Sequence, residues 1–157
     1  MRKSIPMLDN SITNDEFLSL IVDSFQSVIF GTVDQNGDPH TNVADIEIKD
    51  NDKLIFATTY QKAFYNRLKN HPRISITGLK GEETLSSVGF TLDGIAEEVD
   101  QKYLDEIFAT RPEMKQISAN HSERRSILRP FAITPINGSI YDLRQQPIFK
   151  KSLDFQK

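Results

Sequence analysis

The sequence predicts a mainly β protein with peripheral helices, whose antiparallel strands curl into a barrel. Short apolar, β-branched segments follow one another with turn residues between them, which is the pattern of antiparallel strands. Later strand segments are long and contain glycine, which marks bulges and bends of the kind that curl a sheet. Only short stretches show helical periodicity, and these helices are expected to lie on the sheet.

The chain is expected to form one domain. Its 157 residues, of which 38% are hydrophobic, are enough to bury a core, and no repeat, low-complexity block or linker divides them. We therefore predict a single domain over residues 1–157, with its core at about 14–143 and a polar tail at 144–157.

The composition argues against several classes of function. The 19 Lys and Arg residues are outnumbered by 22 Asp and Glu, and the net charge of −3 offers no positive field for nucleic acid or an anionic membrane. The chain has no cysteine, which excludes disulfides, thiolate nucleophiles and Cys-ligated metals, and its three histidines are scattered. No secretory signal or membrane-spanning stretch is found, so a cytoplasmic protein without a metal site is expected.

A helix is predicted at about residues 14–25. Thr13 and Glu16 form the pattern of a capping box, and apolar residues follow at helical spacing. The next three elements are strands at 27–33, 41–48 and 53–58. An Asn-Gly turn signal separates the first two, so the three strands are expected to form an antiparallel meander.

The second half of the chain is predicted to combine strands with short helices. The expected elements are a helix at 62–70, strands at 74–79 and 85–99, a helix at 100–111, a short helix at 112–117, and a final strand pair at 131–135 and 139–143. The turn of this last pair is placed at Asn137 and Gly138, a dipeptide typical of hairpins.

One polar cluster in the sequence could carry chemistry. Motifs of hydrolases, nucleoside triphosphatases, dinucleotide-binding folds and zinc proteases are absent, and no catalytic residue can be assigned. Thr58, Thr59, Gln61 and Lys62 lie where a strand ends and a helix begins. Hydroxyls, an ammonium and the free N–H groups of a helix start can together hold a phosphate. The alternative interpretation is an ordinary polar loop with a solvated lysine.

A second candidate lies on the preceding predicted strand. A planar cofactor ring needs backbone donors and acceptors along one edge and a small residue that lets the ring approach. Asn42, Val43 and Ala44 meet this description. The alternative interpretation is an ordinary half-exposed strand.

A third polar stretch could contact a substrate. Arg124, Arg125 and Arg129 lie close together between predicted elements and could cap an anionic group. A solvated loop is the simpler interpretation of the same residues.

Several short motifs follow one another in a characteristic order. They are G-T-V-D-x-x-G-x-P at 31–39, K-L-I-F-A-T-T at 53–59, Lys62, F-Y-N-R-L at 64–68, H-P-R-I-S-I at 71–76 and G-I-A-E-E-V at 94–99. This order resembles the pyridoxamine 5′-phosphate oxidase-like split-barrel flavoproteins. The resemblance covers about residues 17–99, with a looser match to residue 143.

The resemblance implies a six-stranded antiparallel split β-barrel of the FMN-binding type. It also implies a homodimer with FMN in a groove at the subunit interface. In such proteins the phosphate is held at the end of a strand and before the next helix, which here means Thr58, Thr59 and Lys62, with Gln61 in addition.

The resemblance also assigns the edge of the flavin ring. It is met by the strand after the G-x-P turn, which here means Asn42, Val43 and Ala44. Many proteins of this kind carry an arginine at the place of Asn42 and a Gln or Trp at the place of Gly89. We therefore expect these two contacts to be missing or replaced.

The function implied is that of an FMN-dependent oxidoreductase that passes electrons from a reduced donor to a small-molecule acceptor. The chain has no tryptophan and no longer C-terminal part with an arginine-bearing substrate motif, so it is not expected to make pyridoxal phosphate. It looks closer to the small members of the family, which are associated with nitroimidazole reduction or with unassigned flavin redox roles. One alternative is a non-enzymatic flavin- or haem-binding module, in which His40 or His121 would ligate iron; another is a barrel without cofactor.

Overall fold

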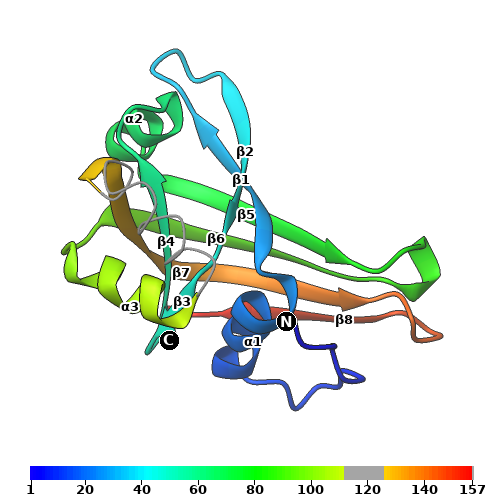
Figure 1. Cartoon of the computed structure of the whole chain (residues 1–157). Coiled ribbons are helices and arrows are strands. Elements are labelled where there is room, and N and C mark those ends of the chain that lie inside the picture. The colour runs from blue at the N-terminus through cyan, green and yellow to red at the C-terminus, as the bar shows by residue number, and fades with distance from the viewer. Residues whose placement is uncertain (112–125, 157) are drawn as a thin grey trace.

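The computed structural model describes residues 1–111 and 126–156 (Figure 1). Its strands are β1 (Ser27–Val33), β2 (Pro39–Asp45), β3 (Ile48–Asp50), β4 (Lys53–Thr59), β5 (Arg73–Lys80), β6 (Val88–Glu98), β7 (Leu128–Asp142) and β8 (Phe149–Asp154). Its helices are α1 (Asn14–Leu20), α2 (Ala63–Asn70) and α3 (Lys102–Thr110), with a π-helical turn η1 (Ile21–Phe25) and a 3-10 turn η2 (Thr84–Ser86). The strands form one antiparallel sheet in the order β2-β1-β5-β6-β7-β4-β3, with β8 paired to β7. The predicted fold class, a mainly β protein with a curled antiparallel sheet, is confirmed.

The sheet curls because its two end strands are consecutive in the chain. β2 and β3 lie at opposite ends of the strand order, and only Ile46 and Glu47 separate them. The N–H of Ile46 donates to the carbonyl of Gln26 (2.8 Å), whereas the N–H of Glu47 donates to the carbonyl of Ile55 (2.8 Å). The chain thus leaves β1 and joins β4 within two residues, which divides the strand predicted at 41–48.

The N-terminal helix begins as predicted and then widens. The N–H of Glu16 donates to Thr13 Oγ1 (3.1 Å), and Glu16 Oε1 accepts from the N–H of Thr13 (3.2 Å), so the capping box is present. The last turn is π-helical, with the N–H of Gln26 donating to the carbonyl of Ile21 (2.8 Å). Phe17 and Ile21 are fully buried, so the apolar stripe of this helix belongs to the core.

The strand pair predicted at 131–135 and 139–143 is wrong, because all of these residues except Leu143 belong to the single strand β7. Every residue of β6, from Val88 to Glu98, pairs with a residue of β7 between Phe131 and Asp142. A Cβ at Gly138 would lie 2.7 Å from the carbonyl oxygen of Thr91, so this glycine serves the close approach of β6 and not a turn. Pairing with a long neighbouring strand therefore overrides the local turn signal.

Part of the predicted polar tail forms β8. This strand pairs with the end of β7, and Leu153 is buried in the core. Seven strand segments are predicted from the sequence; β8 and the division of the second strand add two, and the merger of the last pair into β7 removes one, which gives the eight strands of the structure. The helix predicted at 112–117 lies outside the described residues.

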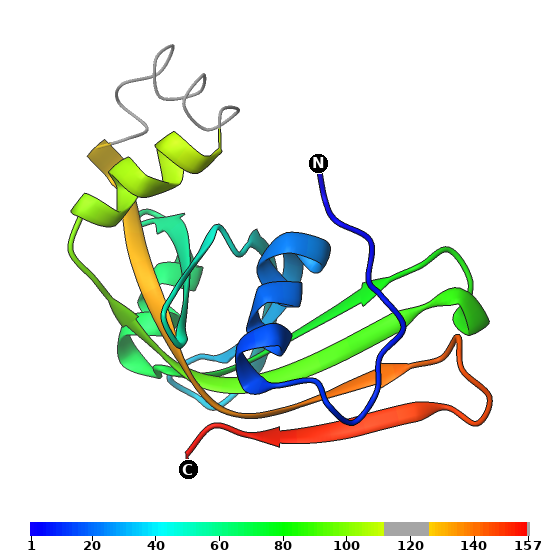
Figure 2. The ribbon, with the colours of Figure 1, turned by 90° about the horizontal axis from the view of Figure 1, so that it is seen from below.

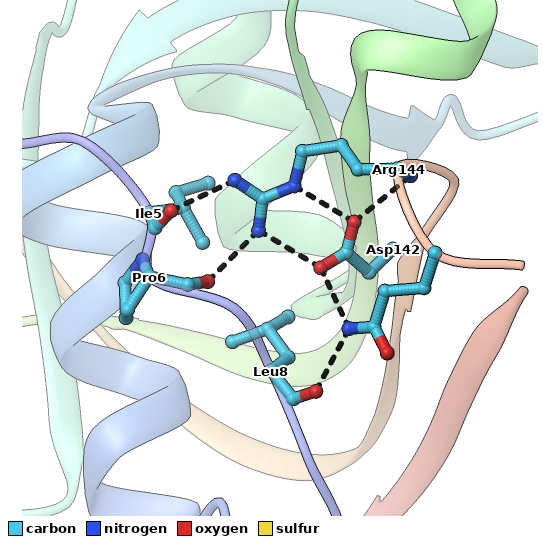
Figure 3. Close-up of polar contacts among 6 residues, drawn as sticks. Ile5, Pro6, Leu8, Asp142 and Arg144 are labelled. Carbon is cyan, nitrogen blue, oxygen red and sulfur yellow. Dashed lines mark hydrogen bonds and ion pairs between the residues drawn. The ribbon is translucent and has the colours of Figure 1, made fainter.

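Residues 1–12, the N-terminal arm, lie with α1 on one side of the long strands β6, β7 and β8 (Figure 2). Ile5 and Leu8 are each 6% exposed and belong to the core cluster. Arg144 donates to the carbonyls of Ile5 and Pro6 at 2.8 Å each (Figure 3). The arm is therefore held both by burial and through its backbone.

Aromatic side chains fill the curl of the sheet. Phe30 of β1, Phe56 of β4 and Phe131 of β7 are fully buried. Phe64 of α2 joins them, with its ring 5.4 Å from that of Phe30. α2 is therefore packed on the core beside the end of β4. None of the helices within residues 1–111 and 126–156 is long and apolar enough to cross a membrane.

Candidate functional site

The turn between β4 and α2 brings together Thr58, Thr59, Gln61 and Lys62. Thr58 is 5% exposed and Thr59 is half-buried, whereas Gln61 and Lys62 are exposed. The N–H of Lys62 donates to the carbonyl of Thr59 (3.2 Å), which tightens the turn. The predicted polar cluster thus lies in one short segment between a core strand and the helix packed on that core.

The start of α2 is electropositive. Lys62 occupies the N-cap position in an extended conformation, and its side chain does not cap the helix. The first turn contains no acidic residue, although Asp and Glu are the residues that favour this end of a helix. A cation here opposes the helix dipole, and a bound anion would relieve that opposition. The turn is chemically suited to an anion such as phosphate.

Arg129 adds a second cation beside this turn. The sequence interpretation placed it in a loop, but it lies on β7, opposite Thr58 of β4. Its guanidinium stacks on the ring of Tyr60, 4.8 Å from the ring centre. Strand pairing, which local sequence does not show, brings Arg129 to the end of β4. Arg124 and Arg125 lie outside the described residues.

The three β2 residues do not face the same way. Asn42 and Ala44 pair with the buried Phe30 and Val28 of β1 and so face the inside of the curl. Val43, between them, is 72% exposed on the outside. A ligand on either face therefore meets the side chains of some of these residues and only the backbone of the others.

Arg67 connects α2 with β2, a contact that the sequence interpretation missed. Its Nη2 donates to Asn42 Oδ1 (2.6 Å), and its Nε donates to Thr32 Oγ1 of β1 (2.9 Å). A guanidinium therefore does lie beside Asn42, supplied by α2 instead of by β2. The sequence contains one indication of this role: Arg67 lies four residues after Ala63, so it is expected on the same polar flank of the predicted helix as the residues at the helix start.

The other flank of α2 is tied to β6. Tyr65 donates from its hydroxyl to Glu98 Oε1 (2.5 Å), and Lys69 Nζ lies 3.3 Å from the same oxygen. The hydrogen bond to Glu98 raises the pKa of Tyr65 above its usual value. Burial opposes ionisation of Glu98, but hydrogen bonds from Tyr65 and Lys69 hold its pKa below the usual value. Contacts on both flanks thus orient the start of α2.

Two cavities adjoin the predicted residues. One of about 510 Å³ lies on β1, β2, β5, β6 and β7 and is lined by Thr41, among others. The other, of about 310 Å³, lies between α2 and the β1–β2 connection and is lined by Ala63 and Arg67, among others. Thr41 precedes Asn42 and Ala63 follows Lys62, so both cavities begin next to predicted site residues.

Comparison with known proteins identifies the family. The sequence model of the family described as pyridoxamine 5′-phosphate oxidase matches residues 14–138. No curated protein sequence matches the chain. Among solved structures, a haem-binding protein from Mycobacterium smegmatis is similar with a TM-score of 0.70 and 16% identity over 92% of this chain. The chain spans 59% of the length of that protein.

Two further structures share the fold. A NimC/NimA family protein from Clostridium acetobutylicum has a TM-score of 0.62 and 13% identity, with 88% of each chain covered. A pyridoxamine 5′-phosphate oxidase-related, FMN-binding protein from Nostoc punctiforme has a TM-score of 0.59 and 15% identity, covering 84% of this chain and 87% of that one. With most of its length matched by the family model and its curled sheet shared with these structures, the chain belongs to the pyridoxamine 5′-phosphate oxidase family.

Proposed function

We propose that the protein binds FMN and is an oxidoreductase that passes electrons from a reduced donor to a small acceptor. The observation that carries the proposal is the electropositive start of α2, where Lys62 stands without an acidic neighbour in the first turn. The FMN-binding protein of the same fold supports it. When bound, FMN supplies the electron chemistry, and the protein positions the flavin and tunes it through hydrogen bonds.

The chain's own residues have separate tasks in this proposal. Lys62, the Thr59 hydroxyl and the first N–H groups of α2 hold the phosphate, with Thr58 and Gln61 beside them. The edge of the flavin is met by Asn42, Val43 and Ala44. Val43 contacts the flavin either through its backbone or through its side chain on the outer face of β2. Flavin is preferred to haem because these groups suit a phosphate, and because His40 Nε2 already lies 2.9 Å from Asp34 Oδ2. His121, the other iron ligand that the sequence offers, lies outside the described residues.

The double variant Lys62→Ala with Thr59→Ala is expected to bind FMN about 100-fold more weakly. Two contacts to a charged phosphate are lost, each worth about 1.5 kcal/mol or more. The dissociation constant is measured by quenching of flavin fluorescence. Lys53→Ala, which removes an exposed lysine at the far end of β4, serves as the control and should leave affinity unchanged. Equal affinity of the double variant and the wild type would sink the assignment.

The visible absorption spectrum tests the cofactor itself. After addition of FMN and removal of the excess, retained flavin bands would support the proposal. Reduction of those bands by a nicotinamide donor, followed by reoxidation with a nitro or quinone acceptor, would support the oxidoreductase role. A sharp haem band with stoichiometric uptake would instead favour the non-enzymatic haem-binding module.

A second copy of the chain completes the proposed site. Ile29 and Val43 are paired neighbours on the outer face of β1 and β2, 45% and 72% exposed, and Leu79 of β5 is 66% exposed. Exposed apolar side chains on an antiparallel sheet suit an interface between copies. Because Val43 adjoins Asn42, a partner on this face would cover one side of the flavin strand.

The double variant Ile29→Lys with Val43→Lys is expected to be monomeric, whereas the wild type is dimeric. Two lysines on this face would have to be buried without partners in the dimer. Light scattering after size-exclusion chromatography should give about twice 17.9 kDa for the wild type and 17.9 kDa for the variant. Ser152→Lys, an exposed change on β8, should remain dimeric. A monomeric wild type, or a variant that still dimerises, would contradict the proposed interface.

A further inference from the structure

The cavity of about 310 Å³ between α2 and the β1–β2 connection contains a cation, Arg67, for which the described part of the chain provides no ion pair. Arg67 is half-buried there, and its two hydrogen-bonded partners, Thr32 Oγ1 and Asn42 Oδ1, are both neutral. Within residues 1–111 and 126–156, no carboxylate forms an ion pair with Arg67. Taking a charge out of water without pairing it is costly, so this guanidinium suits an anionic ligand.

The one carboxylate in the cavity lining is engaged elsewhere. Asp34 Oδ1 accepts from the N–H groups of Asn36 (2.9 Å) and Asp38 (3.0 Å), and its Oδ2 lies 2.9 Å from His40 Nε2. These contacts, with the His40 hydrogen bond the strongest, hold the pKa of Asp34 below its usual value. These contacts close the β1–β2 turn, and within residues 1–111 and 126–156 no hydrogen bond or ion pair joins Asp34 to Arg67.

Several other residues of the cavity lining can donate hydrogen bonds to oxygen. Asn66 and Asn70 line it from the same flank of α2 as Arg67, and His71 lines it at the end of that helix. A guanidinium with two amides beside it resembles the donor sets that bind phosphate, whose oxygens accept several hydrogen bonds at once. Ala63, at the start of α2, lines the same cavity as Arg67.

We propose that this cavity binds the phosphate group of a small molecule through Arg67. The phosphate belongs either to FMN itself or to a separate phosphorylated substrate. Phosphate binding by Arg67 does not depend on the proposed function, whereas the choice between these two sources does. Asn42, which Arg67 also contacts, then couples the occupied cavity to β2.

Inorganic phosphate, titrated calorimetrically into the flavin-free protein, tests the site directly. Arg67→Gln should weaken phosphate binding about tenfold or more, and Arg67→Lys, which keeps the charge, should restore part of it. Thr32→Val removes the Nε contact but keeps the guanidinium, and should change phosphate affinity by less than about threefold. If the wild type binds no phosphate, if Arg67→Gln binds it equally well, or if Thr32→Val loses as much as Arg67→Gln, the proposal is overturned.

FMN and riboflavin distinguish the two sources of phosphate. If Arg67 binds the flavin phosphate, the Arg67→Gln variant should lose most of its preference in affinity for FMN over riboflavin, and its affinity for riboflavin should equal that of the wild type. If a separate molecule occupies the cavity, that preference should survive, and phosphate should still bind to the FMN-loaded wild type but not to FMN-loaded Arg67→Gln. A wild type that binds phosphate in an Arg67-dependent way but binds no flavin would overturn the proposed function and leave this inference standing.

Discussion

Replacing Asp142 by asparagine is expected to lower the free energy of unfolding by about 3 kcal/mol, because it breaks a buried ion pair from one side. The Asp142 side chain is fully buried and accepts from Arg144 Nε and Nη2 (2.8 Å each), from the Arg144 N–H (3.0 Å) and from Gln145 Nε2 (3.0 Å). Arg144 in turn donates to the carbonyls of Ile5 and Pro6, as Figure 3 shows. The substitution therefore loosens the N-terminal arm as well as the end of β7.

Urea unfolding measures this loss. The exposed turn residue Asp52 provides a matched control, since Asp52→Asn should change stability by less than about 0.5 kcal/mol. In the Asp142→Asn variant, the rate of amide hydrogen exchange should increase more in the N-terminal arm than in α2. A loss below about 1 kcal/mol would show that the arm is held by burial of Ile5 and Leu8 alone.

The same carboxylate predicts a pH dependence of stability. The hydrogen bond from Arg144 lowers the pKa of Asp142 from 3.8 to about 2 in the folded protein. Because the folded pKa is lower than the unfolded one, the stabilisation is complete above about pH 4 and is lost as the pH falls toward 2. The stability difference between wild type and Asp142→Asn should shrink by about 2 kcal/mol over this range, and a difference independent of pH would contradict it.

Replacing Phe56 by alanine is expected to cost about 4 kcal/mol, the other large effect. The Phe56 ring is fully buried, stacked on Phe131 with ring centres 5.5 Å apart, and 4.6 Å from the ring of Phe30. It also lies 6.2 Å from the Phe64 ring of α2. The cavity left behind would loosen α2, so FMN affinity should fall although Phe56 is not proposed to contact FMN.

The conservative variant Phe56→Leu serves as the comparison. It keeps most of the buried volume and should cost less than half as much in urea unfolding, with a smaller loss of FMN affinity. If Phe56→Ala lost less than about 1.5 kcal/mol, the aromatic cluster would not be what holds α2 on the end of β4.

Elements with strong local signals could be predicted from the sequence. The capping box at Thr13 and Glu16 satisfies backbone donors within four residues, so its geometry depends only on local sequence. The Asn-Gly turn between β1 and β2 and the strand-to-helix turn before Ala63 are equally local. The family resemblance rested on the order of such segments, and the match over residues 14–138 confirms it.

Elements whose partners are distant in sequence could not be predicted. Asn137 and Gly138 carry a turn signal, but both residues pair with β6, beside a register shift between Asp93 and Gly94. The glycine allows the close approach of the two strands and does not form a turn. β8 has too few apolar residues to show a pattern, and it forms because β7 leaves an edge for it to pair with.

For the candidate site, the sequence by itself determined the cluster of Thr58, Thr59, Gln61 and Lys62, because residues within one five-residue segment need no tertiary contact to lie together. Only the tertiary structure decided that Asn42 and Ala44 face inward while Val43 faces outward, since this depends on which side of β2 the core occupies. It also decided that Arg67 reaches Asn42, 25 residues away in the chain, because the sheet curls until β2 lies beside α2. Local chemistry is readable from neighbouring residues, whereas the meeting of distant side chains depends on how the whole sheet closes.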